Sequence, residues 1–173
     1  MENKHDILDK IKKLNNDFKI TLNTAPSSIS EEKIRSGFLN KLFEFFGWNL
    51  SDISEVIEEK PLKGIAKENL KSIGSDNKRP DYILCENSIH KMIVDAKNIT
   101  EDFKKSKSYA FQIRSYSWSS NLPIAMISNF QEFGIYDTTF IPEANQDSDY
   151  RAIFFSISIL YRTAEIYKPR RQG

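Results

Sequence analysis

The sequence predicts an α/β domain in which a mixed β-sheet is flanked by helices. Patterns typical of helices and of strands follow one another in the order helix, strand, strand, strand, helix, strand, strand, helix. Short turns join some neighbouring apolar runs, whereas a helix-length segment joins two others, which implies antiparallel pairs and one crossover. At 173 residues the chain is sized for one domain with an ordinary core.

The composition is that of a globular protein, with 39% hydrophobic and 28% charged residues. The formal net charge is +1, so no overall basic field indicates nucleic acid, and any such surface must be local. Cys85 is the only cysteine, which excludes an internal disulfide and a cysteine zinc site and suits a reducing compartment. The N-terminus has no apolar signal segment, and no apolar run approaches the roughly 20 residues that span a bilayer. We therefore expect a cytoplasmic protein without a membrane partner.

The first elements are two predicted helices. Residues 5–18 repeat apolar side chains at helical spacing among Lys and Asp and indicate an amphipathic helix. Residues 24–28, Thr-Ala-Pro-Ser-Ser, end it, and Ser30 is placed to cap a second helix. That helix ends at Gly47 and carries one broad apolar face, formed by Ile34, Phe38, Leu42, Phe45 and Phe46.

A hairpin is predicted at the centre of the chain. Before it come a predicted strand at 53–59 and a polar stretch at 63–78, which indicates a loop with a short helical piece. The apolar runs 82–85 and 91–96 are separated by the turn-like residues 86–88, Glu-Asn-Ser, as in an antiparallel hairpin.

The hairpin carries the candidate site. Asp95 and Lys97 share one face, because side chains alternate along a strand. If the loop is odd-numbered and centred near Ser88, Asp81 lies opposite Asp95 on that face, whereas a two-residue turn would place Asp81 on the other face. Like charges opposite each other destabilise a sheet, and a divalent metal with the nearby lysine would compensate them.

The second half of the chain supplies the remaining elements. In order, we expect a helix at 101–118, strands at 124–127 and 133–136, a loop at 138–149, and a helix from Tyr150 to Tyr167. Residues 168–173, Lys-Pro-Arg-Arg-Gln-Gly, are a basic tail. Tyr116 and Trp118 are interpreted as packing residues.

Two carboxylates and a lysine at one end of a sheet suit phosphodiester hydrolysis. Hard oxygen ligands bind Mg²⁺, which keeps several waters and accepts phosphate oxygens. The metal lowers the pKa of a bound water and stabilises charge on phosphorus. A lysine beside it orients or deprotonates that water, or neutralises the transition state.

These residues resemble the PD-(D/E)XK nuclease motif, because Pro80-Asp81 is followed after thirteen residues by Asp95-Ala96-Lys97. The flanking segments are similar to those of type IIG restriction–modification enzymes. They are Glu32–Arg35 leading to Phe46-Gly47-Trp48-Asn49, the helix Ala110–Ser119 (compare A-x-Q-x-R-x-Y-x-W-S), and Leu122–Asp137 (compare LP-x-x-x-L-T-(D/N)-F-E-E-F-x-x-Y-D). The resemblance covers about residues 30–142.

The resemblance implies a restriction-endonuclease-like fold with an αβββαβ core. Residues 1–29 would form a helical extension, 30–142 the nuclease core, and 143–173 a C-terminal helix and basic tail. The tail would lead to methyltransferase and specificity modules of a longer chain. The implied activity is that of a type II site-specific deoxyribonuclease acting on double-stranded DNA with Mg²⁺, for which Mn²⁺ substitutes, and two copies are expected to pair transiently for double-strand cleavage.

The resemblance also assigns roles to residues. Asp81 and Asp95 would be metal ligands, Lys97 the catalytic lysine, and Gln112 a contact to the scissile region or the attacking water. Glu32 matches an additional active-site acid, although Glu31, Glu58 and Glu59 stay open as alternatives. Two departures are Asp95, where the family usually has Glu, and Asn98, where relatives often carry Lys followed by Pro.

DNA contacts and the alternative functions complete the predictions. Lys104, Lys105, Lys107 and Arg114 would form one helix face that contacts phosphates, or else a solvated face. No recognition helix is present, so sequence readout is expected outside this segment. The alternatives to an endonuclease are a catalytically inactive DNA-binding or docking module of the same fold and, less favoured by the flanking segments, an exonuclease or repair nuclease.

Overall fold

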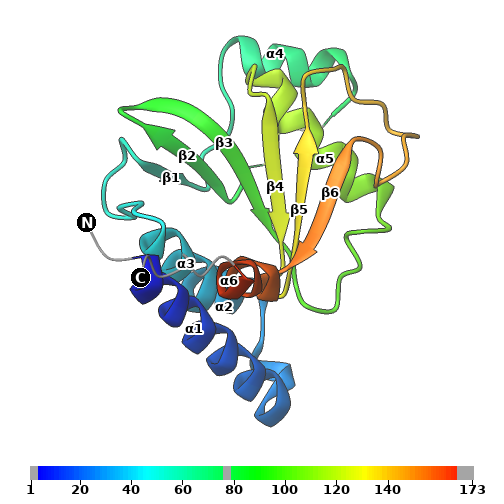
Figure 1. Ribbon diagram of the computed structural model, residues 1–173. Coiled ribbons are helices and arrows are strands. Elements are labelled where there is room, and N and C mark those ends of the chain that lie inside the picture. Colours follow the sequence, from blue (N-terminus) through cyan, green and yellow to red (C-terminus); the bar gives the residue numbers. More distant parts are fainter. Residues whose placement is uncertain (1–3, 76–78, 167–173) are drawn as a thin grey trace.

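A computed structural model describes residues 4–75 and 79–166 and shows a mixed six-stranded sheet (Figure 1). The strands lie in sequence order and are β1 (Val56–Glu58), β2 (Tyr82–Glu86), β3 (Ile89–Ala96), β4 (Ile124–Ser128), β5 (Glu132–Asp137) and β6 (Ala152–Ser156). β3 and β4 are parallel and the other neighbouring strands are antiparallel. The parallel pair is the one joined by a helical crossover, as its connection requires. The predicted α/β class is therefore confirmed.

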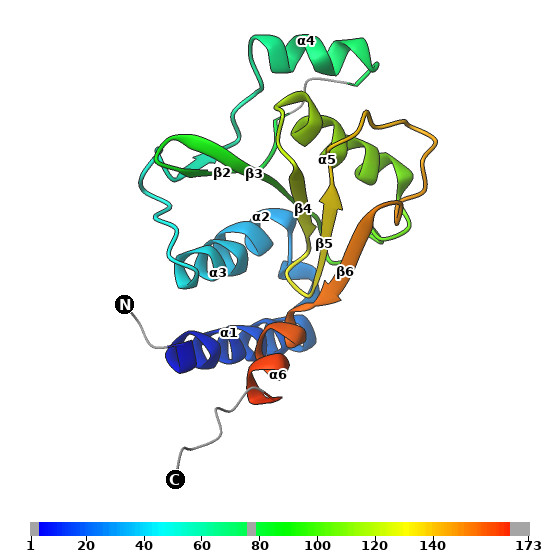
Figure 2. The ribbon, with the colours of Figure 1, turned by 45° about the horizontal axis from the view of Figure 1, so that its top comes forward.

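Helices cover both faces of the sheet (Figures 1 and 2). One layer contains α1 (Lys4–Thr24), a 3₁₀ turn (Pro26–Ser28), α2 (Glu31–Ile34), a π-helical turn (Arg35–Leu39), α3 (Asn40–Phe45) and α6 (Ile157–Ile166). The other contains α4 (Ile65–Ser72) and α5 (Lys107–Ser119). Alternate side chains of the central strands enter two separate cores, so Tyr82 and Val94 pack toward the first layer and Ile83 and Ile93 toward the second. None of the helices in the described ranges is both long and apolar enough to cross a membrane.

The second predicted helix forms one helical stretch with an extra residue in one turn. Ser30 caps it, because its Oγ accepts a hydrogen bond from the Lys33 amide at 3.1 Å. In the π-helical turn the Asn40 amide donates to the Arg35 carbonyl, a spacing of five residues. Such turns are rare and are often found at functional sites, and this one carries Arg35, which lies beside Asp81 at the start of β2.

The hairpin of β2 and β3 has the expected register, but it combines a two-residue turn with a β-bulge. Asn87 and Ser88 have φ values of 52° and 66°, which a two-residue turn of type I′ needs. By itself that turn would place Asp81 on the wrong face. A one-residue shift between the pairs Cys85↔His90 and Leu84↔Met92 makes Lys91 the extra residue of a β-bulge. The pairs beyond the bulge end in Tyr82↔Val94, and the next positions along are Asp81 and Asp95.

Two of the predicted elements have wrong boundaries. The strand expected at 53–59 covers only Val56–Glu58, and Ile53 is exposed. The helix expected at 101–118 begins at Lys107, because Ser106 caps it by accepting from the Tyr109 amide at 3.3 Å. The expected helical piece within 63–78 is confirmed as α4.

The largest correction concerns residues 150–156, which were expected to start the last helix. Ala152–Ser156 instead form β6, which pairs antiparallel with β5, and α6 begins only at Ile157. Phe154 packs against Tyr136 with ring centroids 5.9 Å apart, and Gly134 opposite leaves room for its ring. The apolar run therefore serves a strand and then a helix, and helical spacing across the junction was misleading. The basic tail at 168–173 lies outside the described residues.

Candidate active site

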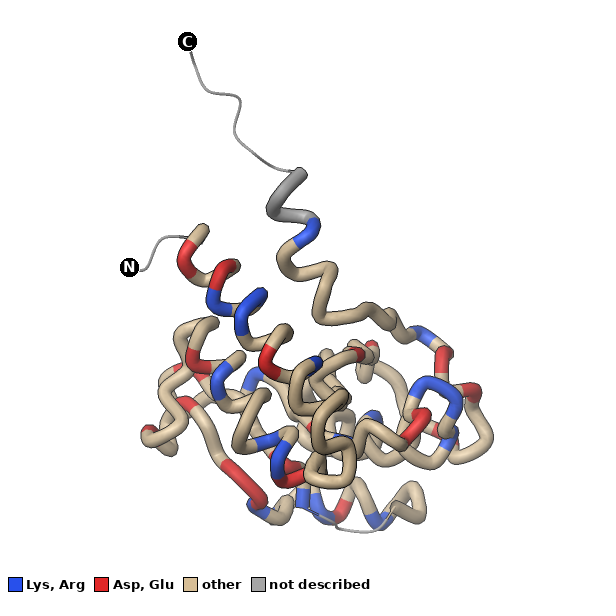
Figure 3. The backbone as a smooth tube through the Cα atoms, turned by 90° about the horizontal axis from the view of Figure 1, so that it is seen from below, with Lys and Arg blue, Asp and Glu red and all other residues tan. Residues whose placement is uncertain are grey.

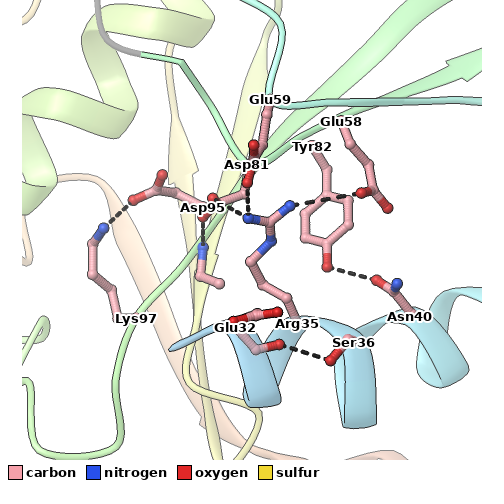
Figure 4. Close-up of polar contacts among 11 residues, drawn as sticks. Glu32, Arg35, Ser36, Asn40, Glu58, Glu59, Asp81, Tyr82, Asp95 and Lys97 are labelled. Atoms are coloured by element: carbon pink, nitrogen blue, oxygen red, sulfur yellow. Dashed lines mark hydrogen bonds and ion pairs between the residues drawn. The ribbon is translucent and has the colours of Figure 1, made fainter. Parts of the chain in front are cut away.

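The structure brings Asp81, Asp95 and Lys97 together where β2 begins and β3 ends (Figure 4). Asp81 Oδ2 accepts a hydrogen bond from the Ala96 amide at 2.6 Å, which fixes this carboxylate across the strand pair. Lys97 directly follows β3, where its amide donates to the Ser128 carbonyl at 2.9 Å, and its ammonium forms an ion pair with Asp95 Oδ2. Two carboxylates and one cation therefore share one end of the sheet.

Burial makes this group electrostatically unusual. Asp95 and Lys97 are only 4% and 8% exposed. Burial and then the neighbouring Asp95 raise the pKa of Asp81 to about 6, and burial also raises the pKa of Asp95. Burial alone would lower the pKa of Lys97, but Asp95, Glu31 and Asp81 together raise it above its usual value. Lys97 is therefore a cation, whereas the ionised forms of Asp81 and Asp95 are less favourable here than in water.

The donor set fits a magnesium ion. Asp81 and Asp95 offer hard carboxylate oxygens. The pKa of Asp81 is raised first by burial and then by the negative charge of Asp95, and a divalent ion would compensate that charge. Across the described residues, no group of three or more His, Cys, Asp or Glu side chains is arranged to hold a metal. Mg²⁺ is usually held in proteins by one or two carboxylates, with water and substrate phosphate completing its shell.

Arg35 is a member of the site that the sequence did not reveal. Its Nη1 lies 3.4 Å from Asp81 Oδ1 and also forms an ion pair with Glu59, while its Nη2 lies 3.7 Å from Glu58 Oε2 (Figure 4). The guanidinium carbon lies 5.3 Å from the Tyr82 ring centroid. Burial would lower the pKa of Arg35, but Glu59 and then Asp81 raise it above its usual value.

The acids of the first layer divide between two environments. Glu31 is exposed as a residue, but partial burial of its carboxylate raises its pKa, and it interacts electrostatically with Lys97 and Asp81. Glu32, which the resemblance singled out, lines a neighbouring cavity of about 380 Å³ together with Arg35, Ser36, Asn40, Glu58, Glu59 and Tyr82. Of the four open candidates, Glu31 is thus the acid that interacts with Lys97, whereas Glu58 and Glu59 pair with Arg35.

The second layer approaches Lys97 through α5. The Lys97 ammonium lies 4.8 Å from the ring centroid of Tyr109, and the Tyr109 hydroxyl donates to Glu101 Oε2 at 2.7 Å. Gln112, one turn further along, donates to the Tyr116 hydroxyl at 3.4 Å. Tyr109 was not singled out by the sequence, because its role depends on the crossover folding back over β3.

The predicted DNA-contacting residues do not form one helix face. Lys104 and Lys105 precede α5 and pair with Glu132 and Asp102, each at 3.3 Å. Lys107 starts the helix, and its Nζ lies 2.7 Å from Asp147 Oδ1.

Arg114 requires a correction. It is 1% exposed and donates to the backbone carbonyls of Asp147, Ser148 and Tyr150, so it anchors the loop before β6 and does not face solvent. An arginine in a polar helix pattern looks exposed, and only the packing of that loop shows otherwise.

Charge is mixed over the rest of the surface. Figure 3 shows Lys and Arg interspersed with Asp and Glu along the chain, in keeping with totals of 25 basic and 24 acidic residues. A DNA-binding surface would therefore depend on local geometry and on bound metal more than on the overall electrostatic field of the protein.

Comparison with known proteins finds one informative similarity. The chain is 30% identical over 137 residues to the type II restriction enzyme and methyltransferase RM.Eco57I of Escherichia coli, a match that covers 75% of this chain and 13% of the relative. The chain thus corresponds to a small part of that protein's length. No protein-family model matches, and no solved structure shows significant similarity. The similarity supports a domain related to a restriction enzyme.

Proposed function

We propose that this chain is the Mg²⁺-dependent DNA endonuclease domain of a restriction–modification enzyme. The observation that carries the proposal is the meeting of Asp81, Asp95 and Lys97 at one end of the sheet. The similarity to a restriction enzyme and methyltransferase supports the same class of reaction.

In this proposal each residue has a distinct task. Asp81 and Asp95 would hold Mg²⁺, which supplies an acidified water and stabilises charge on phosphorus. Lys97, charged in this environment, would donate to a non-bridging phosphate oxygen as negative charge develops there. Asp95 of β3 and the Tyr109 ring of α5 would together hold the ammonium in place. Glu31 would be the additional active-site acid, the place that the resemblance gave to Glu32, and would orient the water or the lysine.

Several further proposals extend this one, some from the relative and some from the resemblance of the sequence to type IIG restriction–modification enzymes. Methyltransferase and specificity modules would lie in a longer chain, with sequence recognition outside this domain. Two copies would pair transiently, because one such site cuts one strand at a time. The activity would be that of a type II site-specific deoxyribonuclease.

Plasmid nicking tests the proposal. The wild type and Lys97→Ala are compared in Mg²⁺, Mn²⁺ and EDTA, with Lys41→Ala, an exposed lysine of α3, as the matched control. We expect metal-dependent nicking by the wild type and by Lys41→Ala that is lost in Lys97→Ala. Equal nicking by Lys97→Ala would refute the role of Lys97.

A catalytically inactive docking module of the same fold is the second candidate. The observation in its favour is Arg35, a basic side chain that lies against Asp81 where a metal ligand needs a free oxygen. This candidate predicts neither nicking nor binding of Mn²⁺ by calorimetry. Mn²⁺ binding that is lost in Asp81→Ala and Asp95→Ala would exclude it.

A further inference from the structure

Arg35 and the candidate metal would use the same oxygen of Asp81. Asp81 Oδ2 already accepts the Ala96 amide at 2.6 Å, and Oδ1 faces Arg35 Nη1 at 3.4 Å. Oδ2 has one lone pair left beside that hydrogen bond, so Oδ1 is the less occupied oxygen, and an ion that binds through it meets the guanidinium.

The protein holds Arg35 in this position from several sides. The Tyr82 ring packs against the guanidinium, and the Tyr82 hydroxyl donates to Asn40 Oδ1 at 2.6 Å, which ties that ring to the start of α3. Glu59 and Glu58 pair with the two terminal nitrogens. The side chain of Arg35 is 15% exposed, and its Nε is buried without a hydrogen-bond partner among the described residues. The guanidinium is therefore a built-in cation held mainly by carboxylates.

We infer that Arg35 is a resident cation that competes with the divalent metal for Asp81, and so sets the metal concentration that the site requires. The inference deepens the proposed function and rests on it in one respect, the assignment of Asp81 as a metal ligand. Arg35 is a positioning residue in this account, since it acts on the metal through Asp81 and need not touch DNA.

The sign of the effect follows from charge. Removing the guanidinium removes repulsion of a divalent ion and also frees Glu58 and Glu59, so both consequences strengthen metal binding. Even at the dielectric constant of water, a unit charge and a double charge a few Å apart repel enough to change a binding constant about ten-fold. A residue that only supported the fold would have the opposite effect, because its loss would loosen the site and weaken binding.

Calorimetric titration with Mn²⁺, without DNA and at low salt, tests the inference. We expect Arg35→Gln to bind Mn²⁺ about ten-fold more tightly than the wild type, and Arg35→Lys, which keeps the charge, to bind within about three-fold of it. Glu59→Gln should bind two- to five-fold more weakly, roughly the effect of a half-exposed charge, because its loss leaves the guanidinium less neutralised. Arg151→Gln is the matched control, since Arg151 pairs with Asp137 on the surface at 3.1 Å, and should leave binding unchanged.

Each outcome of the Mn²⁺ titration either supports or overturns the inference. Unchanged or weaker binding by folded Arg35→Gln would overturn the inference, and if that variant does not fold, an unchanged affinity in Glu59→Gln would do so. Absence of Mn²⁺ binding by the wild type would overturn both the inference and the metal site. The predicted shifts in proteins that never nick DNA would leave the inference standing and refute the nuclease proposal.

Discussion

Replacing Asp81 with asparagine is expected to stabilise the metal-free protein at alkaline pH while abolishing metal binding. Burial and Asp95 raise the pKa of Asp81 from 3.8 to about 6. Two units correspond to about 3 kcal/mol of unfavourable free energy for the charged carboxylate in the folded state. Asparagine is neutral and keeps an oxygen that can accept the Ala96 amide, so it should recover much of this energy.

The stability difference between Asp81→Asn and the wild type should grow as the pH rises. Below about pH 4 the carboxyl is protonated in both the folded and the unfolded state, so Asp81→Asn should differ little from the wild type. Between about pH 4 and 6 the unfolded state releases its proton first, and the wild type loses stability as pH rises. Above about pH 6 the difference is complete, which for a chain of this size corresponds to roughly 6–12 °C in Tm.

Urea unfolding in EDTA at pH 8, 6 and 4.5 measures the effect. Asp137→Asn is the control of opposite sign, because the Thr139 hydroxyl and amide hold the pKa of the half-buried Asp137 below its usual value. It should lose a little stability at pH 8, and less as the pH falls. An Asp81→Asn protein no more stable than wild type at pH 8, or a gain that does not vary with pH, would refute the electrostatic reasoning. Added Mg²⁺ should stabilise the wild type alone, by about 1.4 kcal/mol at ten times its Kd.

Three other changes probe the structure around the site. Gly134→Ala would place a Cβ 2.7 Å from the Phe154 ring. It should lower the free energy of unfolding, measured in urea, by about 1–3 kcal/mol. An unchanged free energy of unfolding would contradict the tight packing of β6 on β5. Arg114→Met should lower the free energy of unfolding by about 2–4 kcal/mol, because it leaves three carbonyls without their donor. KM for DNA should be unchanged, and a rise in KM without a loss of stability would restore the predicted role of Arg114 as a phosphate contact. Tyr109→Leu should lower kcat about five- to ten-fold by releasing the Lys97 ammonium. Tyr109→Phe keeps the ring, so its kcat should stay within about two-fold of the wild type. Equal losses of kcat in both variants would argue against a contact between ring and ammonium.

The elements predicted correctly are those whose signals are local. Ser30 caps a helix because its own side chain reaches the amide three residues on. The strands at 124–127 and 133–136 are short apolar runs enclosed by turn residues, and both are present as β4 and β5. Errors arose where two elements share one apolar run, as at 150–157, because helical and strand periodicities overlap over so few residues.

The candidate site was predictable in part for the same reason. Asp81, Asp95 and Lys97 belong to one hairpin, so a pairing of neighbouring strands suffices to bring them together. From the sequence, the pairing register of β2 and β3 depended on the length of the turn between them. A bulge at Lys91 decided it, and a bulge depends on which faces of β2 and β3 the two cores bury.

By itself the sequence determined the order of helices and strands as far as β5, the central hairpin, and the acids and lysine at its end, since these depend on neighbours in the chain. Only the tertiary structure decided which other charges meet them. Arg35 arrives from the helical layer on one face, and Tyr109 from the crossover on the other. Arg114, polar by type, is drawn inside because a distant loop offers it carbonyl acceptors. Long-range packing places these side chains, and no local pattern specifies it.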